Sequence, residues 1–135
     1  MLGEIIGEFQ GKITSQRVLP SDGTNPKVET SVHMTGKFLG IDATNIVTYW
    51  TVMRSMGPLY GEANGIIMTK DGDVLTYIAH GVGKFTGYGS AASFRGDNYI
   101  QVPSEKFTRL NSVAIIFEYE VDDDGNTQAK LWEWK

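Results

Sequence analysis

A phenol, a carboxylate and an amide lie at alternating positions in one stretch of the chain: Tyr60, Glu62 and Asn64. Alternate residues of a β-strand point to the same face of a sheet, so an extended conformation brings these three side chains together. A carboxylate beside a phenol is suited to general acid–base chemistry, and all three groups can hydrogen-bond a ligand. We therefore expect a ligand-binding site here, with Glu62 as the general base if the protein is an enzyme.

The turn after this stretch decides which residues face the candidate site. Asp71-Gly72 between two apolar runs favours a two-residue hairpin turn, because both turn positions require positive φ. That turn places Tyr77 on the face of Glu62 and sets Gly81 opposite the carboxylate. Small residues opposite polar ones leave space that water or a ligand must fill. The sequence thus predicts a pocket, and a solvated face is the alternative.

Two further side chains are expected near this pocket, His80 and Arg95. They lie opposite each other if Thr86–Gly89 forms a four-residue loop. Inside a barrel, Arg95 needs a carboxylate such as Glu62 or an anionic ligand, because an unpaired buried charge is costly. On the outer face it is an ordinary solvated arginine. We include both residues among the ligand-binding candidates and leave the position of Arg95 open.

No sequence motif indicates a cofactor or a metal. A glycine-rich phosphate loop, a nucleophile elbow and a His-Glu-x-x-His motif are all absent. The two histidines, His33 and His80, lack the spacing of metal ligands. The acidic run Asp122–Asn126 resembles the start of a calcium loop but is explained by turn chemistry, with Gly125 in the left-handed position. We expect neither a cofactor nor a bound metal.

Composition limits the partners. The chain has 135 residues, no cysteine and a net charge of -4, and its 12 Lys and Arg residues are scattered. Scattered cations argue against nucleic acid, and the missing cysteines exclude disulfides. The start of the chain lacks the basic and apolar regions of a signal peptide, and no apolar run has the length of a membrane span. We expect a single cytoplasmic domain without a membrane partner.

Short runs rich in Val, Ile, Thr, Phe and Tyr alternate with turn signals, which is typical of an all-β protein. An open meander of long strands would leave two exposed edges, and closing it into a barrel removes them. We therefore predict an eight-stranded antiparallel up-and-down β-barrel with one short helix at Ser104–Asn111; a two-sheet sandwich is the alternative. The expected strands are Gly7–Leu19, Lys27–Phe38, Ile41–Met53, Leu59–Thr69, Val74–Phe85, Ser90–Gln101, Ser112–Val121 and Thr127–Lys135.

The last hairpin is apolar on both faces. The Asp123–Gly125 turn sets Ile116 opposite Trp132 and brings Trp134 to the same face. An apolar patch of this kind marks an interface when it faces outward, and it lines a cavity when it faces inward. We therefore expect Ile116, Trp132 and Trp134 to serve as interface or cavity residues. The interface alternative predicts a homo-oligomer, either a dimer or a trimer.

Several longer stretches resemble a small bacterial family of uncharacterised proteins that is grouped by fold with the allene oxide cyclase barrel. Allene oxide cyclase is a trimer that binds an oxylipin in its barrel and cyclises it mainly by steric control. The resemblance implies a β-barrel with an apolar interior and carries over no active-site residue. The resembling stretches are Leu59–Gly72, Gly81–Gly87, Ser93–Gly96, Phe117–Asp122 and Trp132–Trp134.

Three functions remain compatible with the sequence. The first is a barrel that binds a small apolar or amphipathic molecule. The second is an isomerase or cyclase that acts through a shaped pocket with Glu62 as its base. The third is a packed barrel that acts only through its oligomer surfaces. The sequence leaves open whether the protein is an enzyme.

Overall fold

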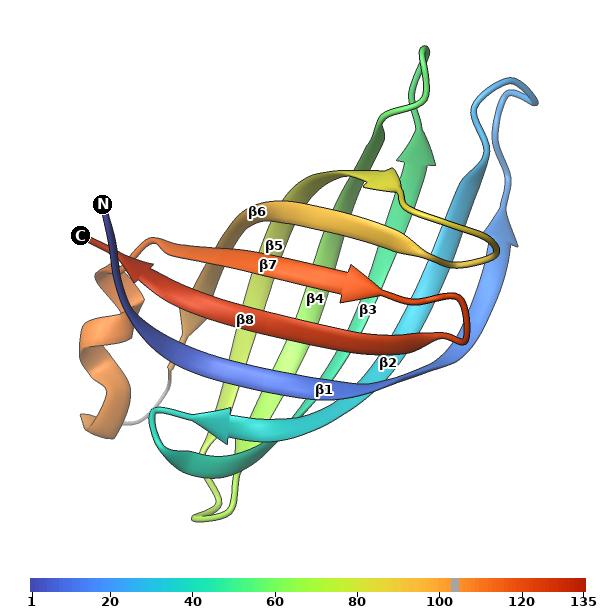
Figure 1. Cartoon of the computed structure of the whole chain (residues 1–135). Coiled ribbons are helices and arrows are strands. Elements are labelled where there is room, and N and C mark those ends of the chain that lie inside the picture. The colour runs from blue at the N-terminus through green and yellow to red at the C-terminus, as the bar shows by residue number, and fades with distance from the viewer. Residues whose placement is uncertain (103–104) are drawn as a thin grey trace.

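The computed structural model describes residues 1–102 and 105–135, and its strands form a closed antiparallel barrel in which β8 pairs back onto β1 (Figure 1). This confirms the all-β, eight-stranded barrel. The strands are β1 (Leu2–Leu19), β2 (Lys27–Phe38), β3 (Ile41–Met53), β4 (Leu59–Thr69), β5 (Val74–Phe85), β6 (Ala92–Gln101), β7 (Ile115–Val121) and β8 (Asn126–Trp134). A short 3-10 helix, η1 (Glu105–Ser112), precedes β7.

Alternation along the strands separates a packed interior from an outer face. In β4, for example, Ile67 is fully buried, whereas its neighbours Ile66 and Met68 are about two-fifths exposed. Burial of one face is the main driving force for this arrangement. The largest fully buried side chains are Phe38, Ile67, Leu75, Leu110, Ile115, Val32 and Thr30.

Several expected boundaries differ from the structure, and β8 runs from Asn126 to Trp134 rather than from Thr127 to Lys135. The strand β1 begins at Leu2 rather than Gly7, because the first residues pair with the end of β8. The strand β7 begins at Ile115 rather than Ser112, because η1 extends to Ser112. The helix expected over Ser104–Asn111 is present as η1, and Ser104 itself lies outside the described residues.

Glycine permits the close approach of neighbouring strands in the barrel wall. A Cβ on Gly36 of β2 would clash with the main-chain carbonyl of Glu8 in β1, and one on Gly96 of β6 would clash with that of His80 in β5. Glycines inside strands commonly mark bends and close backbone contacts. These positions let the long strands curve around a narrow barrel.

The observed register between β4 and β5 differs from the one expected from the sequence. The loop contains three residues, Lys70-Asp71-Gly72, and the Thr69 amide donates to the Asp73 carbonyl at 2.9 Å. Gly72 has a φ of 92°, as the last position of a three-residue hairpin loop requires. The two-residue Asp71-Gly72 turn expected from the sequence is therefore wrong by one residue. A slip of one residue moves every side chain to the other face.

The β5–β6 register is also corrected. The connection spans 86–91, closed by a hydrogen bond from the Thr86 amide to the Ala91 carbonyl, so β6 starts at Ala92 rather than Ser90. Arg95 therefore pairs with Val82, and His80 pairs with Asp97. The four-residue loop Thr86–Gly89 that would have set Arg95 opposite His80 is wrong.

The β7–β8 register agrees with the sequence prediction. Glu118 pairs with Lys130, and Ile116 pairs with Trp132. Asp122 closes the turn by accepting hydrogen bonds from the amides of Asp124 and Asn126, each at 2.9 Å. The three-residue loop and its glycine thus fix this hairpin as expected.

The helix η1 closes one end of the barrel. Phe107 and Leu110 are buried, and the Phe107 ring packs edge-on against Phe38 with ring centroids 6.1 Å apart. Ion pairs from Lys106 to Asp71 at 3.2 Å and from Arg109 to Glu133 at 3.0 Å tie η1 to the barrel wall. The connections β1–β2, β3–β4, β5–β6 and β7–β8 lie at the opposite end, away from η1 (Figure 1).

Candidate functional site

The barrel interior contains a buried tyrosine–amide pair. Tyr77 of β5 is buried, and its hydroxyl donates to Oδ1 of Asn45 in β3 at 2.8 Å. Burial raises the pKa of the Tyr77 hydroxyl well above its ordinary value, because the phenolate would be desolvated. The group is therefore a neutral donor whose hydrogen is committed to Asn45.

An aromatic layer crosses the barrel toward the end that η1 does not cover. The rings of Tyr49 and Tyr119 are 5.6 Å apart edge-on, and Phe94 lies 6.3 Å from Tyr49 and 6.2 Å from Tyr119. The two tyrosine hydroxyls share a hydrogen bond of 3.1 Å. Burial raises the pKa of both hydroxyls. Edge-on packing of this kind favours a defined arrangement of the rings.

A cavity of about 80 Å³ lies in the interior next to this layer. The small residues Ala63, Ala79 and Ala129 contribute to its wall, and Asn98 of β6 borders it with a side chain only 3% exposed. The Asn98 Oδ1 atom is buried and has no hydrogen-bond partner. A buried carbonyl without a donor is unfavourable, so an unused acceptor belongs to a residue of the cavity wall.

A second hollow, of about 470 Å³, lies at the barrel end opposite η1, and we call it the mouth. Its wall is mainly apolar, and Val18 and Phe85 on its border are 80% and 53% exposed. Tyr49 and Phe94 line both the mouth and the inner cavity. The aromatic layer therefore forms the boundary between them. The other mouth residues are Ile13, Gln16, Arg17, Pro26, Val28, Thr30, Thr51, Met53, Leu59, Gly89, Ser90, Ala92 and Val121.

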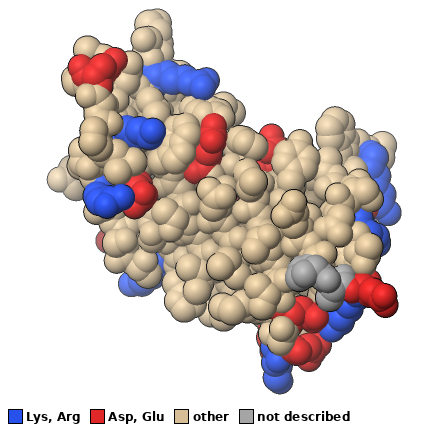
Figure 2. All heavy atoms as spheres, turned by 180° about the vertical axis from the view of Figure 1, so that it is seen from behind, with Lys and Arg blue, Asp and Glu red and all other residues tan. Residues whose placement is uncertain are grey.

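The outer face of β3 to β6 is unusually apolar. Figure 2 shows this side of the barrel with a broad uncharged area across its middle and charged side chains toward the two ends. Large apolar side chains there stay between 39% and 52% exposed: Ile46, Ile66, Met68, Val74, Ile78 and Tyr99. A contiguous patch of this kind is typical of an interaction surface.

The sequence-predicted site residues fall on two different faces. Tyr77 points into the barrel, whereas Tyr60, Glu62 and Asn64 alternate with the inward residues of β4 and lie on its outer side. The Tyr60 hydroxyl donates to Glu62 Oε2 at 2.7 Å, and the Arg54 guanidinium lies 4.2 Å from the Tyr60 ring centroid. The prediction that these four side chains share one cavity-facing surface is wrong, because the β4–β5 register differs by one residue.

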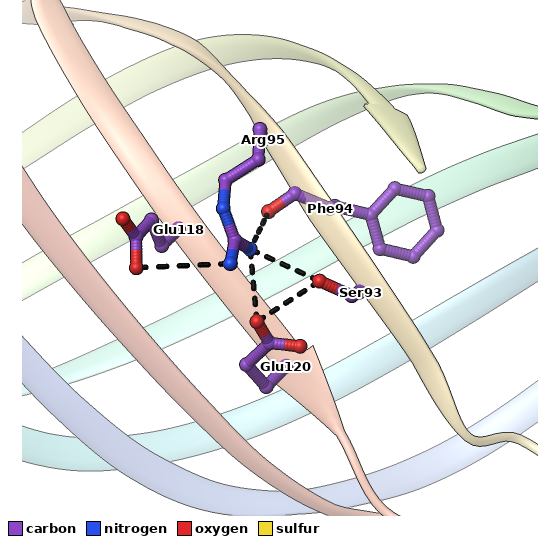
Figure 3. Close-up of polar contacts among 5 residues, drawn as sticks. All are labelled: Ser93, Phe94, Arg95, Glu118 and Glu120. Atoms are coloured by element: carbon purple, nitrogen blue, oxygen red, sulfur yellow. Dashed lines mark hydrogen bonds and ion pairs between the residues drawn. The ribbon is translucent and has the colours of Figure 1, made fainter. Parts of the chain in front are cut away.

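His80 and Arg95 also lie on the outer face. His80 Nδ1 is 2.9 Å from Asp97 Oδ1, with both side chains 39% exposed. Figure 3 shows the Arg95 guanidinium between Glu118 and Glu120, while the neighbouring Phe94 ring points the other way. Arg95 lies 2.8 Å from Glu120 and 3.9 Å from Glu118. Of the two positions left open for Arg95, the structure shows the outer one, where carboxylates already pair with it.

The predicted apolar patch of the last hairpin faces outward. Ile116 and Trp132 are half-buried on the outer side and Trp134 is 57% exposed, next to strand-paired Leu2 and Ile5 of β1. The cavity alternative for Ile116, Trp132 and Trp134 is therefore wrong, because Phe117 and Leu131 line the cavity instead. Their role in an interface stays a prediction.

Sequence reasoning missed four interior polar residues, Asn45, Asn98, Tyr49 and Tyr119. A signal for the two amides is present in the sequence: Asn45 alternates with Ala43 and Val47, as Asn98 does with Ile100. A polar residue within the buried set of a strand needs a partner inside the protein. The correct β4–β5 register, which the misjudged Asp71-Gly72 turn obscured, would have placed Tyr77 and Ala79 inward and, through the β5–β6 pairing, Asn98 in the interior.

Two classes of feature do not occur in the part of the chain that the structure describes. No group of three or more His, Cys, Asp or Glu residues there is arranged to hold a metal ion. No helix among residues 1–102 and 105–135 has the length and apolar character needed to cross a membrane.

Comparison with known proteins identifies the fold. No family model and no curated protein matches the chain. Similar solved structures include a conserved protein of unknown function from Rhodopseudomonas palustris, with a TM-score of 0.81 at 14% identity over 98% of this chain and 97% of the other. A beta-barrel like protein from Acinetobacter baumannii matches with a TM-score of 0.82 at 13% identity, over 100% and 96%. An enzyme from Penicillium herquei matches with a TM-score of 0.62 at 14% identity, over 96% and 94%. At these identities the similarity establishes a shared barrel fold.

Proposed function

We propose that the protein binds a small apolar or amphipathic molecule inside the barrel, entering through the mouth. The observation that carries this proposal is that the two hollows adjoin: Tyr49 and Phe94 border both the mouth and the inner cavity. Eight-stranded barrels are just wide enough to be filled by side chains or to hold one small ligand. Here small side chains leave part of the interior unfilled.

The composition of the cavity wall supports a ligand rather than a packing defect. Small residues at neighbouring inward positions, such as Ala63 and Ala79, face each other across β4 and β5. A packed interior normally leaves few voids larger than a water molecule. The sequence resembles a bacterial family grouped by fold with the allene oxide cyclase barrel, and this agrees with the proposal because that barrel binds an oxylipin, which is an amphipathic molecule.

The isomerase or cyclase alternative receives less support from the geometry. It requires a carboxylate beside the ligand, and Glu62 projects from the outer face, where the Tyr60 hydroxyl donates to it. We therefore assign no catalytic step to Glu62. Binding without chemical conversion is the function that the interior supports best.

Native mass spectrometry of the protein purified from its own host tests the binding proposal. The wild-type protein is expected to retain an extra mass that is released on denaturation. Ala79→Phe, which fills the cavity, should lose that mass, whereas Ile78→Phe, on the outer face of the same strand, should keep it. Retention of the same mass by Ala79→Phe, or release from Ile78→Phe alone, would place the ligand outside the barrel.

A second candidate function is self-association through the outer face of β3 to β6. Its half-exposed apolar side chains form a contiguous patch of the kind that marks interaction sites. The middle of this face is uncharged (Figure 2), and outward charges of the same strands, such as Glu62 and Asp97, lie farther along them. A two-fold axis can therefore place the patch against itself, and we propose a second copy of this chain as its occupant.

Sedimentation velocity tests the self-association. The wild-type protein should sediment as an oligomer at micromolar concentration, and Ile78→Lys should shift it to the monomer. Gln10→Lys, an exposed outward position on β1, serves as the control and should leave the oligomer unchanged. A monomeric wild-type protein, or an oligomer that withstands Ile78→Lys, would contradict this interface.

A further inference from the structure

We infer that the inner cavity recognises an uncharged molecule that donates a hydrogen bond to Asn98, namely the hydroxyl end of an alcohol whose apolar part extends toward the mouth. This inference rests on the proposed function, because it requires that a small molecule enters the barrel. It adds the chemical class of the ligand and the residue that selects it.

Asn98 supplies the recognition element. It lies on β6 among inward positions, is 3% exposed, and borders the cavity. Its Oδ1 atom is buried without a donor. Leaving such an atom unpaired is unfavourable, so a hydroxyl that enters the cavity gains a partner that the protein itself does not provide.

The hydroxyl groups that line the cavity are already paired, and this limits which hydrogen bonds a ligand can make there. The Tyr77 hydroxyl donates to Asn45, and the Tyr49 and Tyr119 hydroxyls share a hydrogen bond. Asn98 Oδ1, the unpartnered buried atom of a residue that lines the cavity, is an acceptor, whereas the equally unpartnered Thr127 Oγ1 belongs to a residue outside the lining. A molecule that only accepts hydrogen bonds, such as an ether or a ketone, would leave Asn98 Oδ1 unpaired.

Among the residues that the structure describes, the cavity wall has no inward charged side chain that could pair with an ionised ligand. Glu62 and His80 border the cavity, but their side chains lie on the outer face and interact there with Tyr60 and Asp97. The inward side chains that line the cavity are apolar, amide or phenol groups. A carboxylate or ammonium buried among them would lack a counter-charge, which is strongly unfavourable.

The two hollows fit an amphipathic alcohol. The inner cavity of about 80 Å³ accommodates a hydroxyl with a few attached carbons, and the apolar mouth of about 470 Å³ accommodates a longer tail. Tyr49 and Phe94 border both spaces, so the chain that joins the head and the tail would run along their rings. Polar groups that fix orientation within an otherwise apolar pocket are typical of ligand sites.

Methyl NMR titrations with three matched probes test the inference: 1-hexanol, its isomer 1-methoxypentane, which cannot donate a hydrogen bond, and hexanoate. The shifts of the Ala79 and Ala129 methyl groups report occupancy of the cavity. Wild-type protein should bind 1-hexanol about tenfold more tightly than the ether, the effect of one hydrogen bond, and hexanoate at least as weakly as the ether. Asn98→Leu should bind 1-hexanol and the ether alike, with ether affinity unchanged.

The outcomes separate the inference from the binding proposal. Equal binding of 1-hexanol and the ether by the wild-type protein would overturn the role of Asn98 while leaving the binding proposal intact. Tight binding of hexanoate would overturn the selection of uncharged molecules. Failure of all three probes to shift the interior methyl groups would contradict the binding proposal itself. If Asn98→Leu does not fold, Asn98→Ala replaces it, with the same loss of preference expected.

Discussion

The phenol ring of Tyr77 covers the α-carbon of Gly65, its partner across β4 and β5, and occupies the space that a side chain at position 65 would need. This contact sets the path of the tyrosine across the barrel and brings its hydroxyl to Asn45. The glycine is therefore required by the ring of its neighbour rather than by backbone conformation.

Gly65→Ala should displace the Tyr77 ring and destabilise the protein. Overpacking a well-packed interior costs about 1–3 kcal/mol, and urea unfolding measures the change. In a Tyr77→Leu background the same glycine substitution should cost clearly less, because the obstructing ring is absent. Equal costs in the two backgrounds would mean that Tyr77 does not occupy the space above Gly65.

Tyr77→Phe should lower the free energy of unfolding by about 1–3 kcal/mol, because it leaves Asn45 Oδ1 buried without a donor. Chemical denaturation measures this loss. Tyr99→Phe, which removes a half-exposed hydroxyl on the outer face, serves as the matched control and should change stability by less than about 0.5 kcal/mol. Similar effects of the two substitutions would argue against the interior hydrogen bond.

The barrel itself was predictable because turn residues and alternation act locally. The Asp122–Asn126 loop fixed the β7–β8 register correctly, since three aspartates and a glycine favour one loop length. The bounds of β2 to β5 also agree with the prediction. Closure of the sheet into a barrel was predictable because an open sheet of eight long strands would leave two exposed edges.

The candidate site was less predictable than the fold. It depends on which side chains point into the barrel, and a shift of one residue in the strand register reverses that direction for a whole strand. Asp71-Gly72 is compatible with both a two-residue and a three-residue loop, and the structure has the latter. That single residue moved Tyr77 into the interior and left Glu62 outside. The register expected from a Thr86–Gly89 loop was wrong by two residues. A shift of two residues keeps Arg95 on the same face of the sheet but changes its partner on β5 from His80 to Val82.

Stability should fall at alkaline pH through the buried tyrosines. Burial raises the pKa of Tyr49, Tyr77 and Tyr119 above the ordinary value of 10.0. The folded protein keeps these protons where the unfolded chain loses them, so their contribution is complete below pH 10 and is lost progressively above it. Each such tyrosine adds a slope of about 1.4 kcal/mol per pH unit. Urea unfolding between pH 9 and 11 should show a shallower slope for Tyr77→Phe, and an unchanged slope would contradict this account.

Phe107→Ala should destabilise the closed end of the barrel by about 3–5 kcal/mol, as expected for removal of a buried aromatic side chain. The ring is buried against Phe38 at the base of the barrel. Thermal or urea unfolding measures the loss. Glu105→Ala changes an exposed residue of the same helix and should have little effect. A small effect of Phe107→Ala would show that η1 contributes little to the core.

The most direct test of the central claim, that the barrel binds a small molecule in its interior, is a methyl NMR titration of the wild-type protein with 1-hexanol. Val47, Ala79 and Ala129 line the cavity, whereas Ile66 and Ile78 lie on the outer face. Binding inside the barrel predicts saturable shifts of the inner methyl groups and unchanged outer ones. Shifts confined to Ile66 and Ile78, or no saturable shift at Val47, Ala79 and Ala129, would contradict it.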